Sequence, residues 1–254
     1  MLGLSRKNEI KNLISKEGNV IVAELSGRFN VSDETIRKDL KQLEDEGFLR
    51  RIYGGATVIE SSRKEDAEIR ERLFVAEKDA IAQLCLPLIK NNDSIFLDGS
   101  TTAICLAKQL MDRPITVITN SMIVADIFSN SKAAHLVVIG GLYETHRRMY
   151  LGKTSELCIK EYVFDKSFIS CETLHLEHGI TDSSESHAVL RRLAIEQSHE
   201  AYLITDHTKF NKTSLSFIAP LESINTLITN KPLSQEWIDL LKSNDIPYLF
   251  PPVK

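Results

Sequence analysis

Five consecutive small or polar residues, Asp98-Gly99-Ser100-Thr101-Thr102, follow the apolar run IFL and precede a helical pattern over 103–110. The first turn of a helix has free backbone N–H groups and a positive dipole end, and both favour a bound phosphate. Gly99 is expected to let the backbone approach closely, with a positive φ that a β-branched residue disfavours. The hydroxyls of Ser100, Thr101 and Thr102 can donate to phosphate oxygens. Alternatively, Ser100 or Thr101 only caps the helix, a role that is compatible with phosphate binding.

Polar residues and glycines also follow the next two apolar runs of this region. Asn120 and Ser121 come after VIT, and Gly140 and Gly141 come after VVI. Open α/β sheets bind small molecules in the crevice beyond the carboxyl ends of their strands. We therefore expect these four residues to converge with the loop at Asp98 on one ligand-binding crevice.

Basic side chains gather in a second place, near the N-terminus. Three of them lie on one side of a helical pattern and two lie in a strand-like run: Arg37, Lys38, Lys41, Arg50 and Arg51. Such a cluster suits duplex DNA, because cations contact phosphates and set the register while a few side chains reach base edges. The alternative is an ordinary helix pair whose charges are merely solvated.

Two short helices must position these cations. Residues 22–29 have Ala23, Leu25 and Phe29 at near-helical spacing, and they predict a first helix. Ser32 is a good N-cap for a second helix starting near Asp33, and the acidic first turn suits the helix dipole. The apolar stripe of this second helix is Ile36, Leu40 and Leu43, which leaves the basic side chains on or beside the opposite face. That face can enter a major groove.

A hairpin is expected directly after these helices. The paired glycines Gly54-Gly55 permit the positive φ angles of a tight two-residue turn. Arg50 and Arg51 point to opposite faces by the period of two, so at least one guanidinium faces phosphate oxygens. The residues expected to contact or position DNA are Ser32, Glu34, Thr35, Arg37, Lys38, Lys41, Arg50, Arg51, Tyr53 and Gly54.

Composition excludes several other classes of protein. Residues 1–60 contain ten Lys or Arg and ten Asp or Glu, so the net charge of −4 falls on the remaining 194 residues (21 minus 25). Four widely spaced cysteines and seven histidines lack disulfide or metal spacing, so we expect free thiols, no metal and no cofactor. No apolar run approaches the roughly 18 to 20 residues of a membrane span, so we expect a cytoplasmic protein without membrane contact.

The rest of the chain alternates short β-branched runs with helical patterns. This alternation predicts βαβ units and a parallel sheet buried on both faces. The predicted domains are a winged helix-turn-helix unit at 1–58, a polar linker at 59–74 and an α/β domain at 75–254. A leading helix at 5–17 is expected to pack Ile10, Leu13 and Ile14 on the first unit.

The segment VSDETIRKDLKQLEDEGFLRRIYGGA closely resembles the N-terminal domain of the DeoR family of bacterial sugar-metabolism repressors. IFLDGSTT, VITNS, VVIGG, DKSFIS and ITDHTKF occur in the order of that family's effector domain. The resemblance implies a Rossmann-like second domain similar in fold to ribose-5-phosphate isomerase, in which the loop at 99–102 receives the phosphate of a sugar effector. It also assigns Asp206, Lys209 and Arg191 to the effector pocket or its support.

Five positions depart from the family pattern. Glycine and serine are exchanged at Gly99-Ser100, Ser170 stands for a glycine, Arg191 for a lysine, and Asn230 for an aspartate. The exchange puts the detailed path of the phosphate loop in doubt. Arginine keeps the charge of lysine but presents a planar fork of donors, which could accompany a different effector.

The resemblance implies a DNA-binding transcriptional regulator of a carbohydrate operon, commonly a repressor released by a phosphorylated sugar. Its partners are then double-stranded operator DNA, a phosphosugar effector and further copies of the chain in a dimer or tetramer. An isomerase-like enzyme is the alternative, with Asp98, Asp182, Glu185 or Asp206 as a candidate base. These acids match no known constellation of that enzyme class, so we expect no catalytic residues. A non-catalytic binding module is the third possibility.

Overall fold

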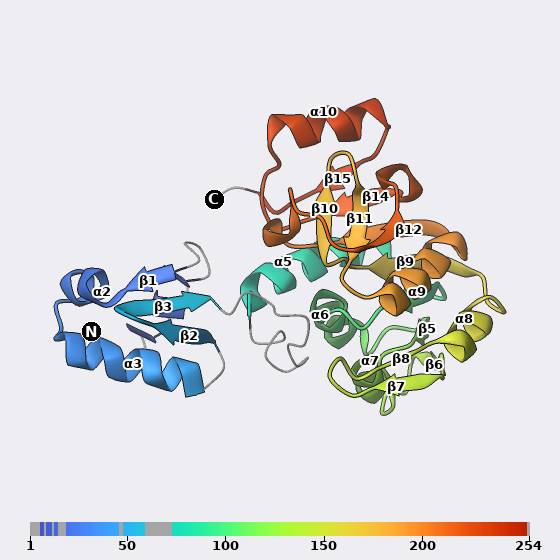
Figure 1. Cartoon of the computed structure of the whole chain (residues 1–254). Coiled ribbons are helices and arrows are strands. Elements are labelled where there is room, and N and C mark those ends of the chain that lie inside the picture. The colour runs from blue at the N-terminus through green and yellow to red at the C-terminus, as the bar shows by residue number, and fades with distance from the viewer. Residues whose placement is uncertain are drawn as a thin grey trace. The chain divides into compact units, whose positions relative to one another are not determined.

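The computed structural model of the chain describes residues 6–7, 9–11, 13–14, 19–45, 48–58 and 73–252. The chain divides into two compact units, residues 1–73 and 74–254 (Figure 1). The linker predicted at 59–74 lies outside the described residues except for Leu73 and Phe74, so its boundaries stay a prediction. Among the helices formed by the described residues, none has the length and hydrophobicity needed to cross a membrane.

The first unit is a winged helix-turn-helix fold, as the sequence predicts. Its helices are α2 (Val22–Phe29) and α3 (Asp33–Asp45), and its antiparallel sheet has the order β1 (Asn19–Ile21), β3 (Gly55–Val58), β2 (Leu49–Ile52). The described residues between 6 and 14 are helical, in agreement with the expected leading helix. The core joins that helix to α2, α3 and the sheet through Ile10, Leu13, Ile14, Leu25, Ile36, Leu40, Leu43 and Leu49.

Two details of this unit differ from the prediction. Ala23 is exposed and Val22 is buried instead, because the strand β1, which was not predicted, runs directly into α2 and turns Val22 inward. The hairpin turn is Tyr53-Gly54, and only Gly54 has a positive φ (81°). Gly55 is paired in β3, where a Cβ would lie 2.1 Å from the carbonyl oxygen of Val20. The second glycine therefore serves close strand packing and not the turn.

The second unit is built on a seven-stranded parallel sheet. Its order is β15-β14-β12-β9-β4-β5-β6, so the chain runs outward from β4 to one edge and then from β9 to the other. The strands are β4 (Ser94–Leu97), β5 (Thr116–Thr119), β6 (His135–Val138), β9 (Phe164–Ile169), β12 (Ser198–Ile204), β14 (Thr226–Ile228) and β15 (Tyr248–Leu249). The order reverses between β4 and β9, and such a switch point is where doubly wound sheets open a crevice for ligands.

Helices cover both faces of this sheet, as the alternation predicts. One hydrophobic cluster holds α5 (Val75–Cys85), α6 (Thr101–Leu110) and α7 (Met122–Phe128) against one face. The other cluster holds α8 (Lys153–Ile159), α9 (Glu185–Glu196) and α10 (Gln235–Ser243) against the opposite face. Successive residues of β4 divide between the clusters, Ile95 and Leu97 to the first and Phe96 to the second. A sheet buried on both sides explains why its strands are apolar runs.

The predicted helices lie close to their observed bounds, but the short antiparallel pieces were missed. One is the hairpin of β7 (Leu142–Glu144) and β8 (Met149–Leu151). The other is a sheet of β10 (Thr173–His175), β11 (Gly179–Asp182) and β13 (Ser216–Ala219). The run LSFIA has the pattern of a strand, and β13 lies within it, but β13 pairs antiparallel with β11 and so lies outside the parallel sheet.

Candidate effector crevice and DNA-reading surface

A buried polar network lies at the switch point of the sheet. Asp98, which directly follows β4, is 1% exposed. Its Oδ1 accepts from the N–H of Ser100 (2.9 Å), and its Oδ2 accepts from the N–H of Ser170 (3.0 Å) and from Nε of Arg191 (2.9 Å). The carboxylate thus ties the ends of β4 and β9 to helix α9, and it fixes the geometry of the crevice.

Arg191 lies between two carboxylates, since its Nη1 donates to Asp182 while its Nε donates to Asp98. Burial tends to raise the pKa of Asp182, but the charges of Arg191 and Arg147 and the N–H of Ser184 hold that pKa below its usual value. Burial tends to lower the pKa of the Arg191 guanidinium, but the charges of Asp182 and Asp98 raise that pKa above its usual value. Asp182 and Arg191 therefore favour their charged forms, and this ion pair supports the crevice.

The predicted phosphate loop forms a helix N-terminus, although its details differ from the expectation. Ser100 is the N-cap of α6, and its Oγ accepts from the N–H of Ala103 (3.2 Å). Gly99 does not have a positive φ, so that part of the prediction is wrong. Instead, a Cβ on Gly99 would lie 2.5 Å from the sulfur of Met149. A side chain at position 99 would therefore require the flexible Met149 side chain to move from the loop.

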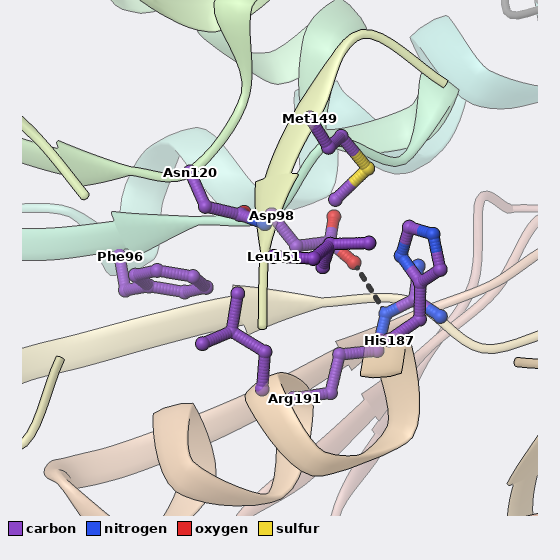
Figure 2. A pocket seen from close by; sticks show the side chains of 8 residues that line it. Phe96, Asp98, Asn120, Met149, Leu151, His187 and Arg191 are labelled. Atoms are coloured by element: carbon purple, nitrogen blue, oxygen red, sulfur yellow. Dashed lines mark hydrogen bonds and ion pairs between the residues drawn. The ribbon is translucent and has the colours of Figure 1, made fainter. Parts of the chain in front are cut away.

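A narrow pocket opens between the loop, α9 and the β7–β8 hairpin (Figure 2). It is lined by Phe96, Asp98, Asn120, Met149, Leu151, His187, Leu190 and Arg191. The space between these side chains is too narrow to hold a water molecule. In Figure 2, Met149 reaches down toward the Asp98 carboxylate, with Asn120 on one side and His187 on the other. The crevice is closed in this conformation.

Three of the other predicted effector residues have mainly structural roles. Ser121 caps α7, its Oγ accepting from the N–H of Val124 (3.3 Å). Gly140 and Gly141 pack on Ser155, whose hydroxyl donates to the carbonyl of Gly140 (2.8 Å), and neither glycine lines the pocket.

Asp206 and Lys209 belong to the turn that follows β12. Asp206 caps the short 3₁₀ helix His207–Lys209 by accepting from the N–H of Thr208 (2.9 Å). Burial raises the pKa of the nearby Cys171 thiol to about 12, while the Thr205 hydroxyl and the charges of Lys209 and Arg191 act against the rise. Lys209 is half-buried and has no ion-pair partner within the described parts of the chain. Its charge therefore remains available beside the crevice.

His187 was not predicted as a site residue. It is 1% exposed, and its Nε2 lies 2.6 Å from Oε2 of Glu144 on β7. Burial lowers the pKa of His187, and the hydrogen bond from the imidazole lowers the pKa of Glu144, so a neutral ring donates to an ionised carboxylate. The spacing of four residues from Arg191 could have revealed it, because residues i and i+4 share one helix face.

The structure also places a possible set of metal ligands that the sequence reading discounted. His175, Glu177 and His178 lie in the β10–β11 hairpin, and their ligand atoms are all within 4.8 Å of one another. The two imidazole rings stack at 4.8 Å between centroids. Two of the three residues are exposed. The expectation that the chain binds no metal stays a prediction.

The DNA-reading surface predicted on the first unit is exposed. Ser32 caps α3, and its Oγ accepts from the N–H of Thr35 (3.3 Å). Arg37, Lys38 and Lys41 are exposed on α3, and none makes an ion pair with another described residue. Glu34 is exposed and Thr35 is half-buried. The helix therefore presents free cations and a hydroxyl on one surface.

The wing differs between its two arginines. Arg50 is exposed without an ion-pair partner among the described residues, whereas Nε of Arg51 donates to Glu44 (2.8 Å). The backbone N–H and the guanidinium of Arg51 lower the pKa of Glu44. Tyr53 and Gly54 form the exposed tip of the hairpin. Arg50 is thus the wing cation that is free to meet phosphate.

A buried ion pair supports this surface from inside, and the sequence reading missed it. Nε of Arg6 lies 2.5 Å from Oδ2 of Asp39, and both side chains are 9% exposed. Asp39 faces inward beside Leu40 and Leu43, so the pair joins the leading helix to α3. Charged residues inside an otherwise apolar stripe are the signal that could have found it.

Family models match both units of the chain. Residues 6–62 match the DeoR-like helix-turn-helix domain, and residues 74–231 match the DeoR C-terminal sensor domain. The chain belongs to the DeoR family. It is therefore a DNA-binding transcriptional regulator with a sensor domain. This result favours the regulator over the isomerase, as the sequence predicts.

Relatives of known name extend over nearly the whole DeoR-family chain. The regulator YulB of Bacillus subtilis is 35% identical over 97% of this chain and 96% of its own length. The L-fucose operon activator of Haemophilus influenzae is 33% identical (95% and 97%), and the repressor GlcR of Bacillus subtilis is 31% identical (94% and 93%). Ribose 5-phosphate isomerase A of Methanocaldococcus jannaschii aligns with a TM-score of 0.39 and 15% identity over 52% of this chain and 53% of its own. That likeness is too distant to bear on function.

Proposed function

We propose that this regulator represses a carbohydrate-utilisation operon and leaves its operator when a phosphorylated sugar binds in the crevice at the β4–β9 switch point. A relative named the L-fucose operon activator supports a role in carbohydrate regulation, and a relative named a transcriptional repressor supports repression. The observation that carries the proposal is the helix N-terminus of α6, with backbone N–H groups left free by the described residues, at that crevice.

The phosphate is expected at the start of α6. The N–H groups of Thr101 and Thr102 have no hydrogen-bond partner among the described residues, because the Ser100 cap satisfies Ala103 instead. Thr101 is half-exposed, and Lys209, whose charge acts on the Cys171 thiol after β9, has no ion-pair partner among the described residues. Arg191 is already neutralised by Asp98 and Asp182, so it acts as support for the pocket.

The DNA contacts are expected on α3 and the wing. Arg37 and Thr35 are placed to reach base edges, and Lys38, Lys41 and Arg50 to contact phosphates. A cytoplasmic homodimer or homotetramer would hold two such units on repeated or inverted half-sites. Effector and operator then oppose each other by the same free energy, typically about 1–3 kcal/mol for a coupling of this kind.

The proposal is tested with an operator selected from random duplex DNA by the full-length protein. A panel of pentose and hexose phosphates is then screened for thermal stabilisation and for release of that operator. A ligand at 100 times its dissociation constant stabilises the folded state by about 2.7 kcal/mol. At least one phosphosugar should both stabilise the protein and release the DNA. A panel in which no compound does either contradicts the proposal.

A further inference from the structure

The pocket contains two buried polar atoms without partners. Within the described part of the chain, Oδ1 of Asn120 and Nδ1 of His187 make no hydrogen bond, and each residue is 1% exposed. A buried group left unpaired is costly to the folded state, so native proteins pair nearly all of them. Both residues line the same pocket, from β5–α7 on one side and α9 on the other (Figure 2).

The neighbours of these two residues determine the chemistry of the free atoms. The Asn120 amide nitrogen donates to the carbonyl oxygen of Tyr150 (2.9 Å), and a flipped amide would set two oxygens against each other. Its free atom is therefore an oxygen acceptor. The Nε2 of His187 faces the Glu144 carboxylate at 2.6 Å and donates its proton there. Burial lowers the pKa of the ring and so favours its neutral form, in which Nδ1 carries a lone pair. The pocket thus offers two acceptors that need donors.

A hydroxyl group is the neutral donor that fits such atoms. The fully ionised phosphate of a sugar monoester has no donor to offer to an acceptor, so the phosphate end of the effector does not suit these two atoms. The polyol part of a sugar carries several O–H donors on one small body, so it can serve both acceptors. The phosphate end requires different partners, which the start of α6 supplies.

We propose that Asn120 and His187 are the residues that recognise the hydroxyl groups of the effector, and that Met149 closes the pocket when they are unoccupied. This inference rests on the proposed function. Met149 is 3% exposed and packs on Gly99, and methionine is unbranched and flexible enough to withdraw. The β7–β8 hairpin is anchored to the same two residues. The Tyr150 N–H donates to the backbone carbonyl oxygen of Asn120 (2.8 Å), and Glu144 pairs with His187. Ligand recognition and the position of the hairpin are therefore linked.

The test compares isosteric apolar variants of the full-length protein. His187→Phe and Asn120→Leu remove the acceptors, and Thr229→Val is the matched control, because Thr229 Oγ1 is also buried and unpaired but does not line this pocket. Calorimetry measures binding of inorganic phosphate and of the tightest-binding member of a pentose and hexose phosphate panel. Each pocket variant should lose about 10- to 100-fold in phosphosugar affinity. Inorganic phosphate affinity should change less than about twofold, and the control should match the parent.

Singly deoxygenated analogues of the same phosphosugar make the test independent of folding defects. At least one analogue should bind the parent protein about tenfold more weakly than the intact phosphosugar does. The same analogue and the intact phosphosugar should bind His187→Phe or Asn120→Leu with equal affinity, because the variant lacks the acceptor for the missing hydroxyl. If removing each hydroxyl weakens binding to the variants as much as it weakens binding to the parent, the hydroxyl assignment is overturned. The proposed function would still stand. A parent that binds neither inorganic phosphate nor any phosphosugar overturns both.

Discussion

The two units of this chain carry their functional charges in opposite ways. On the DNA-reading surface, Arg37, Lys38 and Lys41 are exposed and make no ion pair with described residues. In the sensor crevice, Asp98, Arg191 and Asp182 are buried and bound to one another. Exposed cations act on a polyanion by long-range attraction, which salt screens. Buried charges instead preorganise a small site, and the fold depends on them.

This difference separates binding from stability. A side chain on the reading surface can be removed without disturbing the core, so its loss affects DNA affinity alone. A member of the crevice network cannot be removed without leaving its partners buried and uncompensated. The ion pair of Arg6 and Asp39 shows that the distinction follows burial and not the unit, because it is buried in the DNA-binding unit.

The largest effect is expected from Arg191→Met. Two buried carboxylates, Asp98 and Asp182, would lose their common partner, and breaking a buried pair in this way costs about 3–5 kcal/mol. Urea unfolding of the full-length protein, followed by tryptophan fluorescence from Trp237 in the second unit, measures the loss. Arg148→Met is the control, since no ion pair of Arg148 occurs within the described residues. If Arg191→Met lowers the free energy of unfolding by less than about 1 kcal/mol, the contrast between buried and exposed charges is wrong.

Arg37→Ala should act on DNA binding and leave stability unchanged. If the guanidinium reads a guanine edge, its loss weakens operator binding by about 1–3 kcal/mol and reduces discrimination between sites. Fluorescence anisotropy with the selected operator and with single-base variants measures both quantities. Unchanged affinity in a normally folded variant would remove Arg37 from the reading surface.

Lys38→Ala should weaken binding to all sequences alike. A lysine that contacts one phosphate contributes about one unit to the slope of log affinity against log salt concentration. Titrations of operator and of unrelated duplex DNA between low and high salt give that slope. An effect confined to the operator would instead assign Lys38 to base reading.

Glu44→Gln is expected to have the smallest effect. The carboxylate is partly exposed and pairs with Arg51, and such pairs contribute about 0.2–1 kcal/mol. Because the pKa of Glu44 is lowered in the folded state, this contribution is present above the unfolded pKa and is lost as pH falls through the lowered value. Urea unfolding at neutral and at acidic pH should therefore show parent and variant converging in acid. A gap that persists in acid contradicts the pairing.

Much of the fold could be predicted from local pattern. The stripe Ile36, Leu40, Leu43 and the cap Ser32 defined α3, and apolar runs defined the parallel strands, because long periodic elements reflect burial directly. The β7 and β8 strands contain three residues each, too few for a period to show. Their residues Met149 and Leu151 were consequently missing from the predicted pocket.

The predicted site was only partly predictable for a similar reason. Asp98 and the start of α6 follow from the strand–loop–helix pattern, whereas the roles of Arg191 came from family resemblance alone. Arg191 joins Asp98 from 93 positions away, and no local pattern shows such a contact. The exchange of glycine and serine at Gly99-Ser100 is consistent with the structure. Ser100 caps the helix, and Gly99 leaves room for the Met149 side chain.

The most direct test of effector control at this crevice is operator release by Gly99→Val. Valine would displace Met149 and fill the space that a phosphate needs at the start of α6. Gly140→Ala is the matched control, since a Cβ there meets no atom within 4 Å. Anisotropy of labelled operator is followed against concentration of the phosphosugar that releases the parent. The account predicts that Gly99→Val stays bound to DNA while parent and control are released. A release curve for Gly99→Val that matches the parent would contradict it and place the phosphate elsewhere.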